Sequence, residues 1–293
     1  MSKRWSILYR GSLSSCNYGC DYCPFAKTKN TREELAQDKA ELDRFTQWAI
    51  NRKEWIGILF TPWGEGLIRK HYQQAMTELS WAKNISKVAI QTNLSCPTQW
   101  MEKVNKETFA LWATYHPTQI SLEKFAEKCI ELEAMNIRYS VGFVGFKEDL
   151  DMMEKLRSLL PNSVYLWVNA NKKDPDYYAE EDFLRIERTD PHFRTNTVYH
   201  KSVGEACMAG HSVFSVDGEG NMTRCHFIKQ RIGNIYDADF EDSLYQRPCS
   251  NNTCGCHIGY VHMDKLKQYN LYGKGVLERI PDQWNYENIK ADS

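Results

Sequence analysis

The fold of this chain is constrained most by a regular alternation of short apolar runs and longer amphipathic segments over its first 187 residues. The apolar runs predict strands at Trp5–Tyr9, Ile56–Phe60, Lys87–Gln91, Phe109–Ala113, Arg138–Val144 and Val164–Val168. The segments that follow them predict helices at Thr31–Arg52, Arg69–Lys83, Thr98–Asn105, Ser121–Met135, Glu148–Leu160 and Glu180–Ile186. This alternation predicts parallel strands joined by crossover helices, in either an open barrel or a doubly wound sheet.

The pattern changes after this region. Asp190–Pro191 favours a turn that ends the regular alternation. Further along, His211–Val216 and Asn221–His226 flank the sequence Asp217–Gly220, which predicts a β-hairpin with a glycine-containing turn. We therefore divide the chain into a first domain over residues 1–190 and a smaller second domain over 191–293.

The amino-acid composition disfavours several classes of protein. Lys and Arg total 37 and Asp and Glu total 38, and this balance disfavours a nucleic-acid partner bound by phosphate neutralisation. No apolar run approaches the roughly 18 residues of a spanning helix, so no membrane partner is expected. The first residues lack the apolar stretch of a secretory signal. We expect a cytoplasmic protein with reduced thiols, so its ten cysteines indicate metal binding rather than disulfides.

The first cysteine cluster follows the first predicted strand. Cys16, Cys20 and Cys23 are spaced so that three thiolates converge on one metal centre. Functional residues of parallel α/β folds gather where strands end. Three protein ligands also leave a coordination position open, as catalytic centres require. The alternative is a zinc site completed by a distant His or Cys.

This spacing, with the aromatic Tyr22 before the last cysteine, resembles the signature of the radical S-adenosyl-L-methionine (radical SAM) enzymes. The resemblance implies that Cys16, Cys20 and Cys23 bind three irons of a 4Fe–4S cluster. The fourth iron would bind S-adenosyl-L-methionine (AdoMet), which one electron cleaves to methionine and a 5′-deoxyadenosyl radical. That radical would abstract a hydrogen atom from a substrate. The family's fold implies a partial (β/α)6 TIM-like barrel in which the protein positions and shields the cofactor.

Short segments at the ends of later strands also resemble motifs of this family. The sequence 63–66 is similar to its G-G-E-P segment, and 90–93 to its I-Q-T-N-G segment. The sequence 141–148 is similar to a segment that the family carries near the adenine. The cofactor-binding residues that the resemblance implies are Tyr22, Gly64, Glu65, Gln91, Asn93, Thr114, Val144 and Asn169. For Gly64 the alternative is a simple turn glycine, and for Asn169 a loop-capping role.

The second cysteine cluster lies in the second domain. Cys207, Gly220 and Cys225 have the C-x12-G-x4-C spacing that resembles the opening of SPASM and Twitch auxiliary-cluster domains. Further cysteines stand at 249, 254 and 256. The shorter Twitch form holds one 4Fe–4S cluster with four cysteines, so the resemblance implies one auxiliary cluster and one spare cysteine among Cys249, Cys254 and Cys256. A structural zinc site is the alternative.

The spare cysteine raises a hypothesis about the reaction. A free thiol near the substrate can return a hydrogen atom, which turns an oxidation into a redox-neutral epimerisation. The alternative is a buried, inert cysteine. His116 follows the fourth predicted strand and is a candidate for contact with AdoMet or substrate, or else a loop histidine beside Pro117. Arg10 and His257 are further candidates for substrate contact; a surface ion pair and a capping role are their alternatives.

These features predict a radical SAM oxidoreductase or epimerase with one auxiliary 4Fe–4S cluster. Its substrate would be a small sugar- or amino-acid-like molecule or a peptide side chain, and its partner a one-electron donor such as flavodoxin or ferredoxin. Only fifteen residues precede Cys16, so we expect no fused leader-peptide-binding domain, which favours a small molecule. The alternative is a non-catalytic Fe–S or zinc-binding protein that uses the same cysteines and does not cleave AdoMet.

Overall fold

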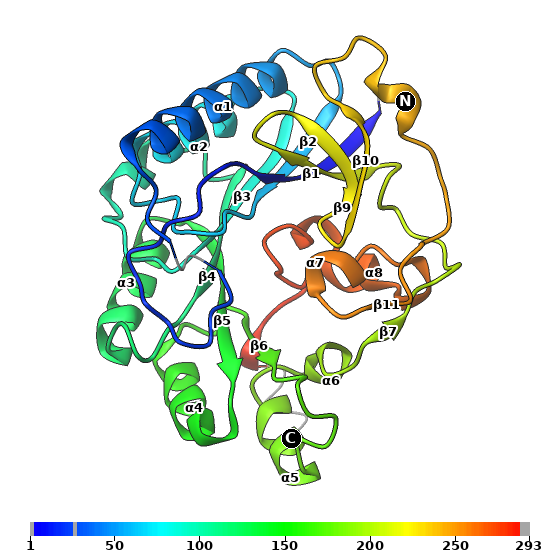
Figure 1. Cartoon of the computed structure of the whole chain (residues 1–293). Coiled ribbons are helices and arrows are strands. Elements are labelled where there is room, and N and C mark those ends of the chain that lie inside the picture. The colour runs from blue at the N-terminus through cyan, green and yellow to red at the C-terminus, as the bar shows by residue number, and fades with distance from the viewer. Residues whose placement is uncertain (1–2, 26–27, 288–293) are drawn as a thin grey trace.

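The computed structural model describes residues 3–25 and 28–287 and is built on one largely parallel sheet (Figure 1). Its strands lie in the order β10-β9-β8-β1-β2-β3-β4-β5-β6. The first six are β1 Arg4–Arg10, β2 Trp55–Phe60, β3 Ile85–Thr92, β4 Phe109–Thr114, β5 Arg138–Gly145 and β6 Leu166–Ala170. Strands β1 to β6 pair in parallel, each with the next in the chain. Because this order never reverses, the sheet is of the open-barrel type and not doubly wound.

Helices connect these strands as the sequence predicts. They are α1 Arg32–Ile50, α2 Lys70–Trp81, α3 Leu122–Ala134 and α4 Leu150–Leu159; the predicted α5 Glu180–Glu187 follows β6, and the short α6 Phe193–Asn196 was not predicted. The helix expected at 98–105 is a 3₁₀ turn over Gln99–Lys103, too short for an α-helix. Strand β6 is displaced by two residues from its predicted start at Val164, because an apolar run alone does not mark its own ends.

Local sequence fixes the N-terminus of α1. The Thr31 side chain accepts from the Glu34 amide, and the Glu34 carboxylate accepts from the Thr31 amide. This capping box satisfies amides that have no partner within the helix. Asp38, on the buried face of α1, accepts from the Leu13 amide at 2.9 Å. Helix α1 therefore holds the chain just before the first cysteine cluster.

The sheet has a core on each face. Helices α1 to α4 cover the outer face, while the end of the chain covers the inner face (Figure 1). The inner core joins strand residues such as Trp112 and Trp167 to Ile258, Tyr272 and Leu277 near the C-terminus. The short helices of that segment are α7 His257–Tyr260 and α8 Gln268–Tyr272. The C-terminal segment therefore occupies part of the barrel interior.

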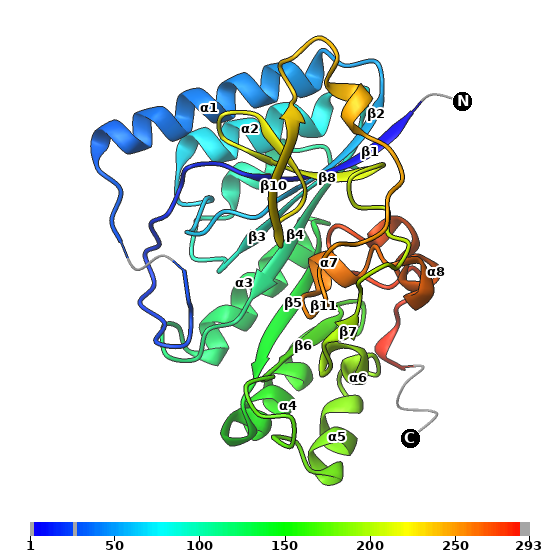
Figure 2. The same ribbon diagram turned by 45° about the vertical axis from the view of Figure 1, so that its right-hand side comes forward.

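The predicted hairpin is present and continues the sheet. It consists of β8 Val213–Asp217 and β9 Asn221–Cys225, and a further strand follows as β10 Ile228–Asn234 (Figure 2). Strand β8 pairs in parallel with β1. Two short strands, β7 His200–Lys201 and β11 Thr253–Cys254, form a separate pair. The domain boundary near residue 190 stays a prediction.

Candidate functional site

A cavity of about 340 Å³ opens at the carboxyl ends of the parallel strands. It gathers residues that lie far apart in the sequence, because consecutive parallel strands present their ends at one edge. The residues predicted for the site that line it are Cys16, Cys20, Cys23, Gly64, Glu65, Gln91, Asn93, Thr114, His116, Val144 and Asn169. Tyr22 stands behind this lining, against His116.

The loop that carries the first cysteines is fastened at its start. The side-chain oxygen of Asn30 accepts from the amides of Ser14 and Ser15, both at 2.9 Å. The Glu65 amide donates to the carbonyl of Ser15. A Cβ on Gly64 would lie 1.8 Å from that carbonyl oxygen, so only glycine allows this approach. The glycine is thus needed for contact between two backbone segments, which a simple turn would not require.

Glu65 is buried, and its carboxylate is engaged with the protein. One oxygen accepts from the Leu67 amide and the Thr92 hydroxyl, both at 2.9 Å, and the other from the Asn93 amide at 2.6 Å. Burial raises the pKa of Glu65 to about 6, although these hydrogen bonds favour the ionised form. Glu65 therefore joins the second strand end to the third and positions Asn93.

Asn93 lies between this network and the cysteine loop. Its side-chain amide donates to Cys16 Sγ at 3.5 Å and to Asn17 Oδ1 at 3.2 Å. Its own oxygen accepts from the Ser95 amide at 2.9 Å. An amide that donates to a cysteine sulfur favours the thiolate form, which metal centres require.

His116 contacts the same loop from the other side. Its Nδ1 lies 2.7 Å from the Tyr22 hydroxyl and 3.5 Å from Cys20 Sγ. The Tyr22 ring stacks on the imidazole with an interplanar angle of 13°. Burial lowers the pKa of His116 to about 4, so the ring is neutral at pH 7. His116 and Tyr22 together brace Cys20.

These contacts fit an iron–sulfur cluster at the first cysteines. The three thiols line one cavity and each has a protein partner, as cluster sulfurs usually do. Burial raises the pKa of Cys16 and Cys20, so charge from a bound cation is needed to keep them as thiolates. Within residues 3–25 and 28–287, no three His, Cys, Asp or Glu side chains surround a single-ion position.

The second cysteine cluster divides between two cavities. Cys207, Cys225, Cys249 and Cys254 line a small separate cavity of about 20 Å³, whereas Cys256 lines the central one. The four thiols come from the loop before β8, the end of β9 and the segment around β11. Among the described residues, these four thiols form no preformed position for a single metal ion.

Several residues that line the central cavity were missed by sequence reasoning, and Trp112, Trp167 and Arg279 are among them. Trp112 and Trp167 are on β4 and β6, each two residues before a predicted site residue, and Arg279 comes from the C-terminal segment. The period of two along a strand would have placed both tryptophans on the same face as Thr114 and Asn169. No local pattern marks Arg279, because only tertiary packing brings it there.

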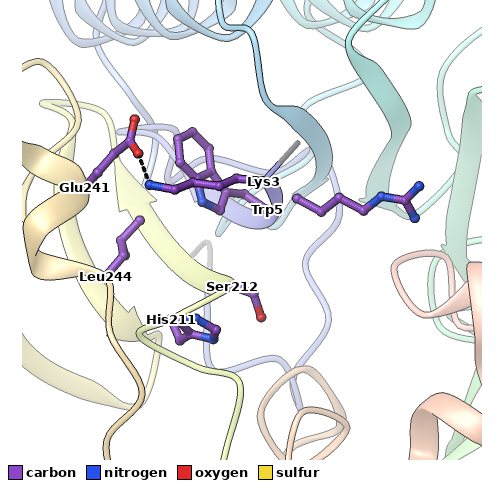
Figure 3. A pocket seen from close by; sticks show the side chains of 7 residues that line it. Lys3, Trp5, His211, Ser212, Glu241 and Leu244 are labelled. Carbon is purple, nitrogen blue, oxygen red and sulfur yellow. Dashed lines mark hydrogen bonds and ion pairs between the residues drawn. The ribbon is translucent and has the colours of Figure 1, made fainter. Parts of the chain in front are cut away.

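Another pocket lies at the opposite end of β1 (Figure 3). It measures about 230 Å³ and is bordered by Lys3, Trp5 and His211. Lys3 makes an ion pair with Glu241 across it (Figure 3). None of the predicted site residues borders this pocket, and the amino ends of barrel strands serve stability rather than chemistry.

No helix in the described part of the chain is long and apolar enough to cross a bilayer. Neither a family model nor a curated protein sequence matches the chain. Solved structures do match. Native anSMEcpe with bound AdoMet is 14% identical with a TM-score of 0.50, over 81% of this chain and 82% of that one.

A polyhistidine-tagged form of anSMEcpe with bound AdoMet is 13% identical with a TM-score of 0.51, over 99% of this chain and 91% of that one. BtrN in complex with AdoMet and 2-DOIA also matches, at 15% identity and a TM-score of 0.38, over 83% and 86% of the two chains. At such low identity the likeness to anSMEcpe is one of fold. The chain shares the α/β fold of anSMEcpe, and this agrees with the fold that the resemblance to the radical SAM enzymes implies.

Proposed function

We propose that this protein is a radical SAM enzyme that cleaves AdoMet reductively and removes a hydrogen atom from a substrate. The observation that carries the proposal is that three cysteines in the family's spacing share one cavity with residues from the ends of five other strands. The anSMEcpe structures with the same fold contain bound AdoMet. A non-catalytic metal protein would not need so many polar strand-end residues around its thiols.

In this proposal Cys16, Cys20 and Cys23 hold a 4Fe–4S cluster, and Gly64, Gln91, Asn93, Thr114, Val144 and Asn169 line the AdoMet site. Bound AdoMet and the reduced cluster supply a 5′-deoxyadenosyl radical, which accepts a hydrogen atom. Glu65 acts as a positioning residue through Asn93. His116 and Tyr22 hold Cys20 in place.

The first test is iron, zinc and acid-labile sulfide per chain after anaerobic reconstitution, together with 5′-deoxyadenosine formed from AdoMet with a one-electron donor. We expect about eight irons for two clusters and AdoMet cleavage in the wild type. Cys23→Ala should lose about four irons and all cleavage. Folded protein that takes up zinc but no iron, or that never cleaves AdoMet, would overturn the proposal in favour of the non-catalytic alternative.

We further propose that Cys207, Cys225, Cys249 and Cys254 hold the auxiliary cluster and that Cys256 is the spare. Support comes from the two cavities, because the first four thiols share one and Cys256 borders the other. Cys254→Ala should therefore lose about four irons, and Cys256→Ala should lose none. Equal losses in both variants would put Cys256 among the ligands.

The position of Cys256 favours epimerisation over oxidation as the net reaction. A substrate carbon that has lost its hydrogen atom would take another from the Cys256 S–H group. The resulting thiyl radical would return to the thiol with one electron from a flavodoxin- or ferredoxin-type donor and one proton from water. Substrate and product then have the same oxidation state, and AdoMet is consumed.

Solvent deuterium tests this step, because the thiol exchanges its proton with water. With any substrate that raises 5′-deoxyadenosine formation above the substrate-free rate, the wild-type product in deuterated water should gain one carbon-bound deuterium. Cys256→Ala should form 5′-deoxyadenosine without deuterated product. The matched control is Cys96→Ala, which changes a buried cysteine outside both cavities. A deuterated product from Cys256→Ala would exclude the role.

A further inference from the structure

The floor of the central cavity holds a buried cation that has no carboxylate partner. Arg279 is 3% exposed, and among residues 3–25 and 28–287 no carboxylate lies within ion-pair distance of its guanidinium. Its Nε has no hydrogen-bond partner. The guanidinium lies 4.2 Å from the centre of the Trp167 ring and 5.7 Å from that of Trp112. Buried charges are usually paired, so this one requires an explanation.

Its neighbours do not neutralise it. The Tyr272 hydroxyl, which is neutral, interacts with the Arg279 guanidinium, and the carboxylate that acts on Arg279 electrostatically is Asp190. Asp190 already accepts from the Tyr165 hydroxyl at 2.6 Å and from the Val168 amide at 2.9 Å. Lys172 is close enough to Arg279 to repel it. The field in this part of the cavity is therefore positive.

The backbone holds Arg279 in place at a conformational cost. Its φ of 54° lies in the left-handed region, which is unfavourable for a residue with a Cβ. The preceding residue, Glu278, is fully buried and pairs with Lys87 on β3 and Arg138 on β5. Its carbonyl also accepts from the Ser140 hydroxyl at 2.6 Å. These contacts fix the C-terminal segment so that Arg279 reaches the cavity.

A second buried polar group lines the same floor. His257 is 4% exposed, and neither of its ring nitrogens has a hydrogen-bond partner. It lies against Trp112, with ring centres 5.5 Å apart, and follows Cys256 directly in the chain. Both side chains border one cavity and carry buried N–H or ring-nitrogen atoms without hydrogen-bond partners, which is the arrangement of a site built to receive a polar ligand.

We propose that Arg279 and His257 form a subsite for a small substrate that carries a carboxylate or phosphate group. A guanidinium binds such an oxyanion through two parallel hydrogen bonds, which are strong where water is excluded. The cavity of about 340 Å³ admits a small molecule and is too small for a folded partner. The role of this subsite in substrate binding rests on the proposed function, because an anion bound there would lie beside Cys256, the proposed hydrogen-atom donor.

This subsite differs from the region proposed for AdoMet. Trp112 and Trp167 each precede a strand-end residue by two positions, so on their face of the sheet they lie one side chain deeper. Arg279 packs on these tryptophans, whereas Cys16, Glu65 and Asn93 belong to the strand-end layer. The oxyanion would therefore lie on the floor of the cavity, below AdoMet.

The test uses reconstituted holoprotein and two probes, inorganic phosphate and succinate, with chloride at matched ionic strength as the control. Radiolabelled phosphate in equilibrium dialysis and tryptophan fluorescence should both report one saturable site per chain. Arg279→Gln should weaken the binding at least tenfold, with partial recovery in Arg279→Lys, while Arg185→Gln on the surface should have no effect.

AdoMet binding, measured in parallel, separates the outcomes. Unchanged AdoMet affinity in Arg279→Gln supports the subsite, whereas an equal loss would assign the guanidinium to the AdoMet carboxylate and overturn it. Wild-type protein without saturable phosphate or succinate binding would also overturn it. If Arg279→Gln does not fold by circular dichroism, His257→Phe decides, because it should weaken anion binding at least threefold. Iron content and 5′-deoxyadenosine formation in the same samples show separately whether the proposed function fails.

Discussion

At the scale of single residues, the geometry of the site depends on buried side chains that fix the positions of the residues lining the cavity. Glu65 is the clearest case, because its two oxygens accept three hydrogen bonds and leave Asn93 facing Cys16. Its pKa of about 6 in the folded chain exceeds the ordinary 4.5, so its ionised form at pH 7 costs roughly 2 kcal/mol of folding free energy. That cost is absent below pH 4.5 and develops as the pH rises through about 6.

Changing Glu65 to Gln should weaken AdoMet binding about tenfold, because an amide has one accepting oxygen and its NH2 group must oppose the N–H of either Leu67 or Asn93. Wild-type affinity should also fall as the pH drops below about 6 and the carboxylate is protonated, while the affinity of the Gln variant stays flat. Equilibrium dialysis of the holoprotein with AdoMet measures both. Glu54→Gln, which affects a partly exposed ion pair, is the matched control, and an equal effect there would contradict the assignment.

At the scale of elements, α1 links helix stability to the position of the loop that carries the first cysteines. Its capping box starts the helix one residue after Asn30, whose side chain holds Ser14 and Ser15. Further along the helix, Asp38 accepts from the Leu13 amide and the Tyr72 hydroxyl, and lies 3.0 Å from His71 Nε2. The N-terminal part of one helix therefore fastens the loop before Cys16.

Thr31→Ala should lower the free energy of unfolding by about 1 kcal/mol, since the Glu34 amide loses its acceptor. Thr31→Ser retains the hydroxyl and should stay near the wild-type value. Urea denaturation under anaerobic conditions measures the difference. Equal destabilisation by Ala and Ser would show that the loss comes from the threonine methyl group and not from the cap.

At the scale of the whole molecule, the C-terminal segment closes the barrel interior and carries buried titratable groups. His262 is 2% exposed, and its Nδ1 lies 2.9 Å from the Tyr269 hydroxyl. Burial lowers its pKa to about 4 in the folded chain, against 6.5 when unfolded. Between these values the unfolded chain binds a proton that the folded chain does not, so stability falls as the pH falls.

The free energy of unfolding should therefore decrease between pH 6.5 and 4, with His262 contributing up to roughly 1.4 kcal/mol per pH unit. His262→Asn does not titrate, so its stability should decline less steeply over this range. Denaturant titrations at pH 7, 6 and 5 measure the two slopes. Parallel slopes for the variant and the wild type would mean that His262 is protonated without loss of packing.

The sequence by itself determined the strand–helix order, a helix that begins near Thr31, the hairpin and the residues at the strand ends. These features depend on periodicity, capping and turn chemistry, which act over a few residues. The resemblance of the cysteine spacing and of the strand-end motifs to the radical SAM family marked Cys16, Gly64 and Asn93 as site residues, and the structure brings them to one cavity. Their assignment to AdoMet and to a cluster stays a prediction.

Only the tertiary structure decided which distant residues meet in each cavity. The path of residues 254–279 back into the barrel decides that Cys256 lies apart from the other late cysteines. The same path brings Arg279 to the central cavity. Glu278 fixes that path through ion pairs with residues more than a hundred positions earlier, and no local pattern encodes such contacts. A pattern of cysteines predicts how many ligands exist, whereas packing across the whole chain decides which cavity each one faces.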